Sequence, residues 1–500
     1  MSWLDNVIGY ISPELGYRRE AWKQSWESLK NYDAGSYDRG NANWRAINQS
    51  AEMTDRFNRD NVRARTRDLE RNSDIMNSVI KAFKRNVYGG GYKLQAKTDN
   101  DNFNDRIETL WEVWCKKNNC DVTGTQSFNQ IIRMAVLRKK VDGGILFLKR
   151  YTKDGIIPFK LQLIEVDELD ITQMAPKNKE NKVIGGIEYN SYNKAVGYWI
   201  KQYSIDGYSI ENPIYIEAKD VIFYFSKTRP SQVREMTDLS PTVTRIRDAN
   251  EYMVAVSVKE RIAACLSVFI KKAVPGGGGS YGRNTQQETG RENYKGKTIT
   301  PGMIKELNPG DEIQVVNPAG QGNDATSYIK LQQRLIGAGQ GISYEATSRD
   351  MSETNYSSAR QGLIEDELTY AEEIELLKEN VLDEIYESFI ISVYLSGLID
   401  MPDFWDKKQE YFWHEWIQKP RKWIDPQKEA NANKISLQTG QKTFKQIAAE
   451  NGKDWKEQID EMCEVLEYAK NKGIELGGVI FDKEESELYF DAEEGQTSKS

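Results

Sequence analysis

The sequence predicts an α+β fold in which helical segments flank an antiparallel, strand-rich middle. Apolar residues recur at three- and four-residue spacing before residue 144 and after residue 236, as on one face of a helix. Between these regions, short β-branched and aromatic runs are separated by turn residues such as Asp154-Gly155 and Asp206-Gly207. A nucleotide-binding fold would instead alternate strands with helices. At 500 residues the chain is long enough for two or more domains.

Residues 1–60 are polar and rich in aromatic side chains, which suits an arm lying on a neighbouring subunit. A partly disordered tail is the alternative. A helix is predicted over residues 60–87, because apolar residues keep helical spacing until Gly89 to Gly91 stop it. Its arginines alternate with carboxylates, so a solvated, salt-bridged face is favoured over a DNA contact. The residues concerned are Arg63, Arg65, Arg67 and Arg71 with Asp60, Asp68 and Glu70.

A second helical region is predicted over residues 103–140. Its expected core positions are Trp111, Trp114, Phe128, Ile131, Ile132 and Val136. From Gly144 the spacing changes to that of strands. Strands are predicted at Ile145–Arg150, Phe159–Ile164, Ile184–Tyr189, Tyr198–Tyr203 and Val221–Phe225.

A helix, an insertion and a returning helix follow the strands. The first helical pattern runs from about Pro241 to Lys272, and the second from about Thr326 to Ile336. Between them we expect a mobile, glycine-rich stretch and a short β segment within residues 298–318. Such an order predicts a hairpin with a projecting tip. The length and one-sided apolar pattern of the first helix suit packing against copies of itself in a ring, with a buried helix of one large domain as the alternative.

The returning helix pattern breaks at glycines 337, 339 and 341, and a polar loop follows. A long helical pattern then begins at Ser357 and continues to about Leu398. The stretch holds neither a set of metal ligands nor a nucleophile with its base, so it is interpreted as a loop held between two helices. From Asp425 to about Lys472 the chain is again helical, and its acidic end is expected to be a disordered tail.

The net charge of −8 argues against tight, sequence-independent DNA binding, which needs clustered Lys and Arg. A channel through which DNA slides has the opposite requirement, because a mildly acidic wall keeps phosphates mobile. Ordinary solubility charge explains the same value equally well.

Motifs for catalysis are incomplete. Gly277 to Asn284 resembles a phosphate-binding loop in outline, but Arg283-Asn284 replaces the required Lys-Ser/Thr pair, and Thr439 to Thr443 lacks the upstream glycine spacing. The single histidine, His414, lies in an aromatic cluster that indicates packing. We therefore predict no catalytic residue, no metal and no cofactor. Paired Asp and Glu side chains could hold Mg²⁺ in a nuclease, although surface solvation is favoured.

The spacing of the cysteines indicates in which cellular compartment the protein is expected. Cys115 and Cys120 lack a second ligand pair, and Cys265 and Cys463 are isolated, so buried, reduced thiols of a cytoplasmic protein are expected rather than a zinc site. The first residues lack a signal-peptide pattern, and no apolar run approaches the roughly 20 residues that span a bilayer. The sequence therefore predicts a soluble protein without a membrane partner.

Motifs in a fixed order give the chain a family resemblance. Gly341-Ile342-Ser343-Tyr344-Glu345, followed by Asn355-Tyr356-Ser357-Ser358-Ala359-Arg360, resembles the tunnel region of lambda-type portal proteins of tailed bacteriophages. Weaker similarities lie in the same order as in that family. They are Arg63 to Asn72 with Gly89 to Gly91, Val141 to Gly144, Leu161 to Leu169, Arg229 to Arg234, Leu307 to Asp311 and Trp423 to Ala430.

The resemblance implies a portal-type fold with a wing of helices and antiparallel strands, a helical stem hairpin, a small clip insertion, a long tunnel helix and a helical C-terminal crown. It divides the chain into an N-terminal arm (1–60), wing domain (61–235), first stem helix (236–272), clip insertion (273–322), second stem helix (323–341), tunnel loop (342–357), long helix and wing return (358–424), crown helices (425–475) and acidic tail (476–500).

The same resemblance implies a dodecameric ring at one capsid vertex, through which double-stranded DNA passes without sequence-specific contacts. The DNA-channel loop would comprise Ser348, Arg349, Asp350, Met351, Ser352, Glu353, Thr354 and Asn355. A motor-docking clip would comprise Lys272, Val274, Tyr281, Arg283, Arg291, Lys295 and Lys297.

The large terminase subunit would supply the ATPase, and the major capsid and head–tail connector proteins would be further partners. The expected location is the portal vertex of the virion, and the host cytoplasm during assembly. Two alternatives stay open: another ring-forming head–tail protein, which is usually much shorter, and a metal-dependent nuclease.

Overall fold

The computed structural model describes residues 12–28, 46–203, 210–265, 269–270, 305–306, 325–418 and 426–474, together with Tyr10 and Asn43. The chain divides into two units, Met1–Thr54 and Asp55–Ser500. In the first unit, helix α2 (Pro13–Ser28) exposes Leu15, Tyr17 and Trp22 to solvent. The short helix α3 (Ala51–Asp55) spans the division. Whether residues 1–60 lie on a neighbouring subunit stays a prediction.

The helix expected over residues 60–87 is two helices, α4 (Arg59–Asn72) and α5 (Asp74–Phe83), followed by the π-helical turn η2 (Lys84–Tyr88). Ser73 separates them. Its extended backbone ends α4, and its hydroxyl oxygen accepts a hydrogen bond from the Met76 N–H at 3.2 Å, which caps α5. Gly89, with φ at 51°, ends the segment where the glycine run was expected to end it.

Helices α6 (Asp101–Trp114), α7 (Lys117–Cys120) and α8 (Phe128–Asp142) form the next region. The six core positions predicted here are all buried. Aromatic rings join the helices, since the ring centroids of Trp111 and Phe128 lie 5.2 Å apart and Trp114 stacks on Phe159 at 5.4 Å. Offset and edge-on ring pairs of this kind add to the stabilisation that burial provides.

Two antiparallel sheets follow, so the predicted α+β class is confirmed. Strand β2 (Gly144–Tyr151) lies between β3 (Phe159–Ile164) and β8 (Val221–Phe225). The second sheet has the order β4 (Lys182–Ile184), β5 (Ile187–Tyr189), β6 (Ala195–Tyr203) and β7 (Ile210–Glu217). The 3-10 turns η3 (Val166–Glu168) and η4 (Ala218–Asp220) connect them. Each predicted strand run lies in a strand, with residues 184–189 divided between β4 and β5.

Four strands in the described part of the chain were missed. One of them, β9 (Phe269–Ile270), lies where the helix from about Pro241 was expected to continue to Lys272, whereas the described helix ends at Cys265. Strand β7 contains Pro213, which weakens a strand pattern but is tolerated on a sheet edge, where β7 lies. Strands β1 (Tyr92–Ala96) and β11 (His414–Gln418) pair with each other across most of the chain. The β segment expected within residues 298–318 lies largely outside the described residues. Its described part is β10 (Lys305–Glu306), which pairs in parallel with β9 (Phe269–Ile270).

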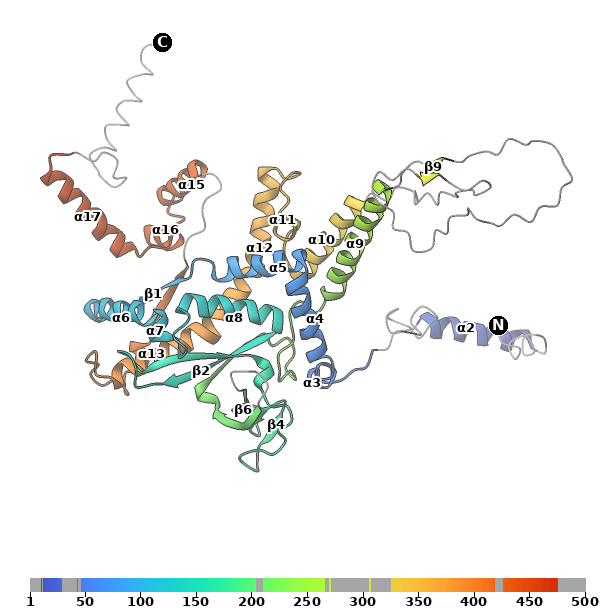
Figure 1. Cartoon of the computed structure of the whole chain (residues 1–500), viewed down its shortest axis with the longest axis horizontal. Helices are drawn as coiled ribbons and strands as arrows, with labels where there is room; N and C mark the ends of the chain where they lie inside the picture. The colour runs from blue at the N-terminus through green and yellow to red at the C-terminus, as the bar shows by residue number, and fades with distance from the viewer. Residues whose placement is uncertain are drawn as a thin grey trace, which may run out of the picture. The chain divides into compact units, whose positions relative to one another are not determined.

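Helices α9 (Val243–Cys265) and α10 (Ala325–Gln340) lie side by side, as Figure 1 shows in green and yellow. Their packing includes the rings of Tyr252 and Tyr328, whose centroids are 4.4 Å apart. The short helix α11 (Tyr344–Ser348) then leads to α12 (Tyr356–Leu377). The helix predicted from Ser357 starts one residue earlier. It continues through the π-helical turn η5 (Lys378–Leu382) into α13 (Asp383–Leu395).

The central core forms where α13 crosses the other helices. Its apolar side chains Ile385, Phe389 and Val393 are fully buried, and Phe389 contacts the ring of Trp111 at 5.0 Å. After the short helix α14 (Lys408–Tyr411) and strand β11, the C-terminal region forms α15 (Pro426–Gln438), α16 (Phe444–Glu450) and α17 (Trp455–Asn471). This region was expected to be helical. The acidic tail, residues 476–500, lies outside the described residues.

Candidate functional site

The segment predicted to face a DNA channel lies between α10 and α12, and close packing requires the glycines before it. Gly341 has φ at 67°, and a Cβ there would come within 2.8 Å of the Thr369 Oγ1. That hydroxyl donates a hydrogen bond to the Gly341 carbonyl oxygen at 2.6 Å. A Cβ on Gly337 would lie 2.7 Å from the Ile342 carbonyl oxygen. The glycine spacing therefore lets the end of α10 turn tightly against α12.

Ser343 fixes the start of α11 to the side of α12. Its hydroxyl oxygen caps α11 by accepting from the Ala346 N–H. Its own N–H and hydroxyl both donate to the carboxylate of Asp366, at 2.6 and 2.8 Å. Asp366 is almost fully buried, so this pair of charge-assisted hydrogen bonds lies away from water. The loop is thus anchored at its first end.

The loop itself is shorter than predicted. Of the eight residues proposed from sequence, Ser348 is the last residue of α11 and Asn355 is the N-cap of α12, accepting from the Ser358 N–H at 2.9 Å. Arg349 takes the left-handed backbone conformation, with φ at 63°. The Asp350 carboxylate accepts from the N–H and hydroxyl of Ser352, at 3.0 and 2.6 Å, and these bonds hold its pKa below the usual value.

The structure brings the eight residues together as one turn, whose outer surface carries a few isolated charges. Arg349, Met351 and Glu353 are exposed, and Lys330 of α10 donates to Glu353 at 2.7 Å. A cavity of about 300 Å³ lies under the turn, between it, α12 and η2. Met351 and Leu363 are among the side chains that line it. The turn therefore carries one exposed guanidinium, that of Arg349, and not a continuous basic surface.

A buried cation that sequence reasoning missed fixes α12 to the rest of the molecule. Lys139 of α8 donates to both carboxylate oxygens of Glu373 in α12, at 2.7 and 2.6 Å, and to Asp238 at 2.9 Å, just before α9. Burial alone would lower the pKa of Lys139, but the two carboxylates hold it above its usual value. The neighbouring Lys140 lies over the ring of Phe83, and burial lowers its pKa.

The expectation of a solvated arginine face on α4 is wrong for Arg63 and Arg67. Arg63 is buried and donates to Glu235 at 2.9 Å, while Arg67 pairs with Asp142 and Asp167, each at 2.7 Å. The alternation of charges was read as a solvent-exposed pattern, but the partners come from distant segments that cover this side of α4. Arg71, at the end of the helix, is solvated as expected.

His414 is held among aromatic rings, as its sequence context indicated. Its ring lies 4.2 Å from that of Tyr386, its Nδ1 faces the Phe412 carbonyl oxygen at 2.7 Å, and its Nε2 lies 3.1 Å from Asp383. Cys120 is buried as expected, whereas Cys463 is exposed because it lies on the open side of α17.

Among the described residues, no three His, Cys, Asp or Glu side chains gather where they could hold a metal ion. None of the helices in the described part of the chain combines the length and apolar character needed to cross a bilayer.

The seven residues predicted for a motor-docking clip cannot be placed in this fold. Lys272, Val274, Tyr281, Arg283, Arg291, Lys295 and Lys297 all lie outside the described residues.

Comparison with known proteins identifies the family. A family model described as phage portal protein, lambda family, matches residues 37–373. The probable portal protein of Halomonas phage phiHAP-1 is 24% identical over 431 residues, covering 83% of this chain and 81% of that protein. Portal protein B of Escherichia phage lambda is 20% identical over 478 residues, covering 86% of this chain and 89% of that protein.

A solved neck of an empty GTA particle covers 78% of this chain and 93% of its own at 11% identity. Its TM-score of 0.40 is too low to support conclusions about architecture. The family match rests on sequence instead, and it extends from residue 37 through α9, α10 and the turn Ser348–Asn355 into α12. Because that match spans more than half of the chain, the protein belongs to the lambda family of phage portal proteins, as its ordered motifs predicted.

Proposed function

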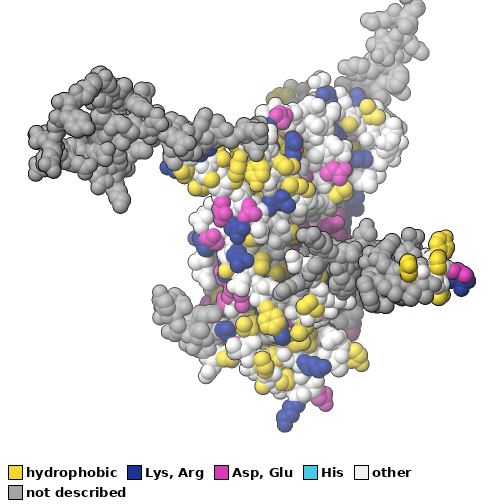
Figure 2. All heavy atoms as spheres, turned by 90° about the vertical axis from the view of Figure 1, so that its right-hand side faces the viewer, with side chains coloured by type: hydrophobic (Ala, Val, Ile, Leu, Met, Phe, Trp, Pro, Cys, Tyr) yellow, Lys and Arg dark blue, Asp and Glu magenta, His cyan; other side chains and the backbone are white. Residues whose placement is uncertain are grey.

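We propose that this chain assembles into a ring, of twelve copies by family resemblance, that forms the DNA channel at one capsid vertex. The observation that supports the ring best is that α9, α10 and α12 each leave apolar side chains open to solvent. These residues are Val254, Val258, Tyr328, Leu331, Leu335, Leu363, Ile364 and Leu368. Figure 2 faces the side of α9 and α10 and shows hydrophobic side chains gathered in its upper part. Monomeric proteins rarely leave such a surface uncovered.

We expect each pair of helices α9 and α10 to form one segment of the ring wall. The interhelical contact of α9 and α10 is narrow, with Tyr252 against Tyr328 and Arg245 donating to Gln332 at 3.3 Å. Among the described side chains of α9, only Val243, Ile246 and Ala249 near its start are buried, and α10 buries Ile336 and Gln340 near its end. The exposed apolar side chains between these two regions would need neighbouring subunits to leave water.

Light scattering and negative-stain microscopy of the purified protein test ring assembly. Closed rings with a central hole are the expected result. The matched variants Leu368→Ser and Met174→Ser test whether the exposed apolar residues of these helices matter more than other exposed apolar residues. Leu368 and Met174 are 64% and 82% exposed, but Met174 lies outside the three helices. Loss of rings in the Leu368 variant alone supports the proposal. Rings that persist in both variants would remove α12 from the interface.

The turn Ser348–Asn355 would line the channel. Support comes from its fixed ends, formed by Ser343 with Asp366 and by Asn355, and from the single exposed Arg349 between acidic and polar neighbours. One guanidinium per subunit gives weak, non-specific phosphate contacts, which a sliding duplex requires.

Arg349→Glu should lower the rate of DNA packaging by about tenfold while rings still form, because a row of cations in the channel becomes a row of anions facing phosphate. The matched control is Lys219→Glu, the same charge reversal at a side chain that is 74% exposed in the strand-rich region. Packaging rate and packaged genome length are measured with each ring. A normal rate and length in the Arg349 variant would exclude this residue from DNA handling.

The remaining partners follow from the family rather than from this chain's described geometry. The clip residues from Lys272 to Lys297 would dock the large terminase subunit, which would supply the ATPase. The chain would therefore act structurally and not as an enzyme. It would assemble in the host cytoplasm and stay in the virion, where the major capsid and head–tail connector proteins contact it.

A further inference from the structure

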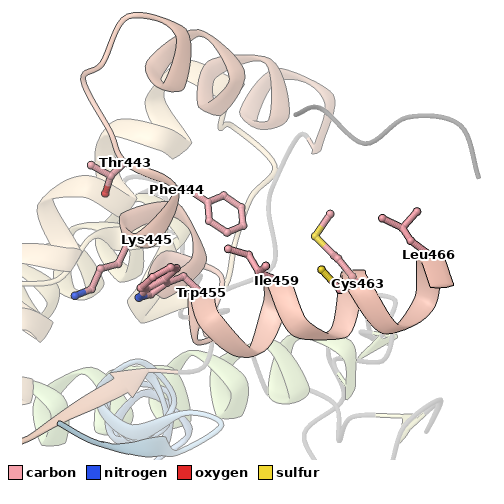
Figure 3. Close-up of a pocket in the computed structure, with 8 residues that line it drawn as sticks. Thr443, Phe444, Lys445, Trp455, Ile459, Cys463 and Leu466 are labelled. Carbon is pink, nitrogen blue, oxygen red and sulfur yellow. The ribbon is translucent and has the colours of Figure 1, made fainter. Parts of the chain in front are cut away.

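An apolar groove of about 590 Å³ lies beside α17 and takes no part in the proposed channel. Trp455, Ile459, Cys463 and Leu466 share one face of α17 by three- and four-residue spacing. Phe444, at the start of α16, lies across from Ile459 and closes one end (Figure 3). Ile459 is 41% exposed, so the groove is apolar yet open to water.

Charge is distributed unevenly around the groove. By helical spacing, Glu457, Glu461 and Glu464 lie on the opposite side of α17, and Glu467 lies on its flank. Lys445 lines the groove next to Phe444, and Lys470 continues the groove face one turn after Leu466. The occupant that this groove suits is therefore apolar in its middle and acidic at one end.

The sequence that follows α17 has this pattern. Val479-Ile480-Phe481 comes directly after Gly477-Gly478 and directly before Asp482, with Glu484 and Glu485 next. We propose that residues 479–481 of the same chain fold back into the groove beside α17, with Asp482 directed toward Lys445. This inference does not depend on the portal function.

The segment after α17 is long enough for residues 479–481 to reach the groove. At a helical rise of about 1.5 Å per residue, Asn471, the last residue of α17, lies about 12 Å along the axis from the level of Cys463. The extended chain from Ile474 to Val479 spans about 17 Å, and the two glycines allow the reversal. Val479 would then lie near Cys463, and Phe481 near Ile459 and Phe444. A second apolar run, Leu488-Tyr489-Phe490, lies too far along the acidic tail to be placed by this path.

Cross-linking in the full-length chain tests the position. Cys463 is exposed on the groove face and serves as the anchor. Under mild oxidation, a Val479→Cys variant should form a disulfide with Cys463, located by peptide mass mapping, whereas the matched Leu488→Cys variant should form about tenfold less. Equal cross-linking of both variants would overturn the inference. A covalent dimer on a non-reducing gel would show that the segment belongs to a second copy, which would overturn the same-chain assignment.

Alkylation of Cys463 by N-ethylmaleimide gives a second readout that needs no new cysteine. Replacing Val479, Ile480 and Phe481 together by serine should raise the alkylation rate about tenfold, as expected for a segment that is docked about nine-tenths of the time. Replacing Leu488, Tyr489 and Phe490 by serine should leave the rate at the wild-type value. An unchanged rate in the first variant, with α17 still folded by circular dichroism, would contradict docking of this segment.

Discussion

Two sets of ion pairs in this chain each join basic side chains to a glutamate but differ in what surrounds them. Around Glu235, a carboxylate with no solvent exposure accepts from Arg63 at 2.9 Å and from Arg234 at 2.7 Å. At the turn Ser348–Asn355, Lys330 and Glu353 also lie 2.7 Å apart, but the Glu353 side chain is 66% exposed. Distance alone would rank these pairs as equals.

Solvent makes the difference. An exposed pair gains little, because water and salt screen the attraction and two long side chains must be held in place. A buried pair adds little more net stability than an apolar core would, but each charge becomes obligatory, since removing one leaves the other uncompensated. The first set therefore holds the fold, whereas the second can separate at little cost in stability.

The largest effect is expected at Glu235. Glu235→Gln should lower the free energy of unfolding by about 3–5 kcal/mol, because Arg63 and Arg234 lose a buried anion. Burial alone would raise the pKa of Glu235, but the two arginines hold it below its usual value. The carboxylate therefore stabilises the fold above about pH 4.5 and loses this role as the pH falls through its folded-state pKa. Urea denaturation at several pH values measures both effects.

Asp248→Asn is the matched control for that experiment. Asp248 pairs with Arg247 at 2.7 Å, yet both side chains are more than half exposed. Its unfolding midpoint should stay at the wild-type value. If the two variants lost similar stability, burial would not be what separates the two kinds of pair.

An intermediate effect is expected at Lys139. Lys139→Met should cost about 2–4 kcal/mol, since Asp238 and Glu373 are left as facing carboxylates. The double variant with Glu373→Gln should recover part of this loss, because one of the two unpaired anions is removed. A double-mutant cycle by chemical denaturation provides the measurement. Strictly additive losses would mean that Lys139 does not connect α8 with α12.

The smallest effect is expected at Lys330. Lys330→Ala should leave the thermal unfolding midpoint unchanged within error, because its pair with Glu353 lies at the surface. Differential scanning calorimetry of the same preparation at low and high salt measures this. A clear drop in the midpoint would indicate that the turn is part of the folded core rather than a surface element.

The sequence predicted local features well. Gly341 ends α10, and the polar cap Asn355 stands where α12 begins. The break expected at Gly337 and Gly339 is wrong, because α10 continues through both to Gln340. Alternating β-branched runs predicted β2, β3, β5, β6 and β8, since their side chains carry the period of a half-buried strand. That the turn faces a channel stays a prediction, because it depends on copies of the chain.

Features that depend on distant partners were missed. In the sequence, Lys139 is one of two adjacent lysines near a helix end, and nothing local indicates that Asp238 and Glu373 will pair with it in the interior. The sequence likewise predicted a solvated Arg63, because its partner Glu235 comes from a distant segment. Strands β1 and β11 are short and unremarkable alone, and they become strands by pairing with each other.

By itself, the sequence determined most of the helices and the strands of regular apolar pattern, several of the residues that cap or end them, and the family to which the chain belongs. These properties depend on backbone freedom and side-chain spacing within a few residues. Only the tertiary structure decided which charges are buried, because desolvation depends on segments that fold over them from far along the chain. That is why Arg63 and Lys139 hold the fold together, while Arg349 stays exposed.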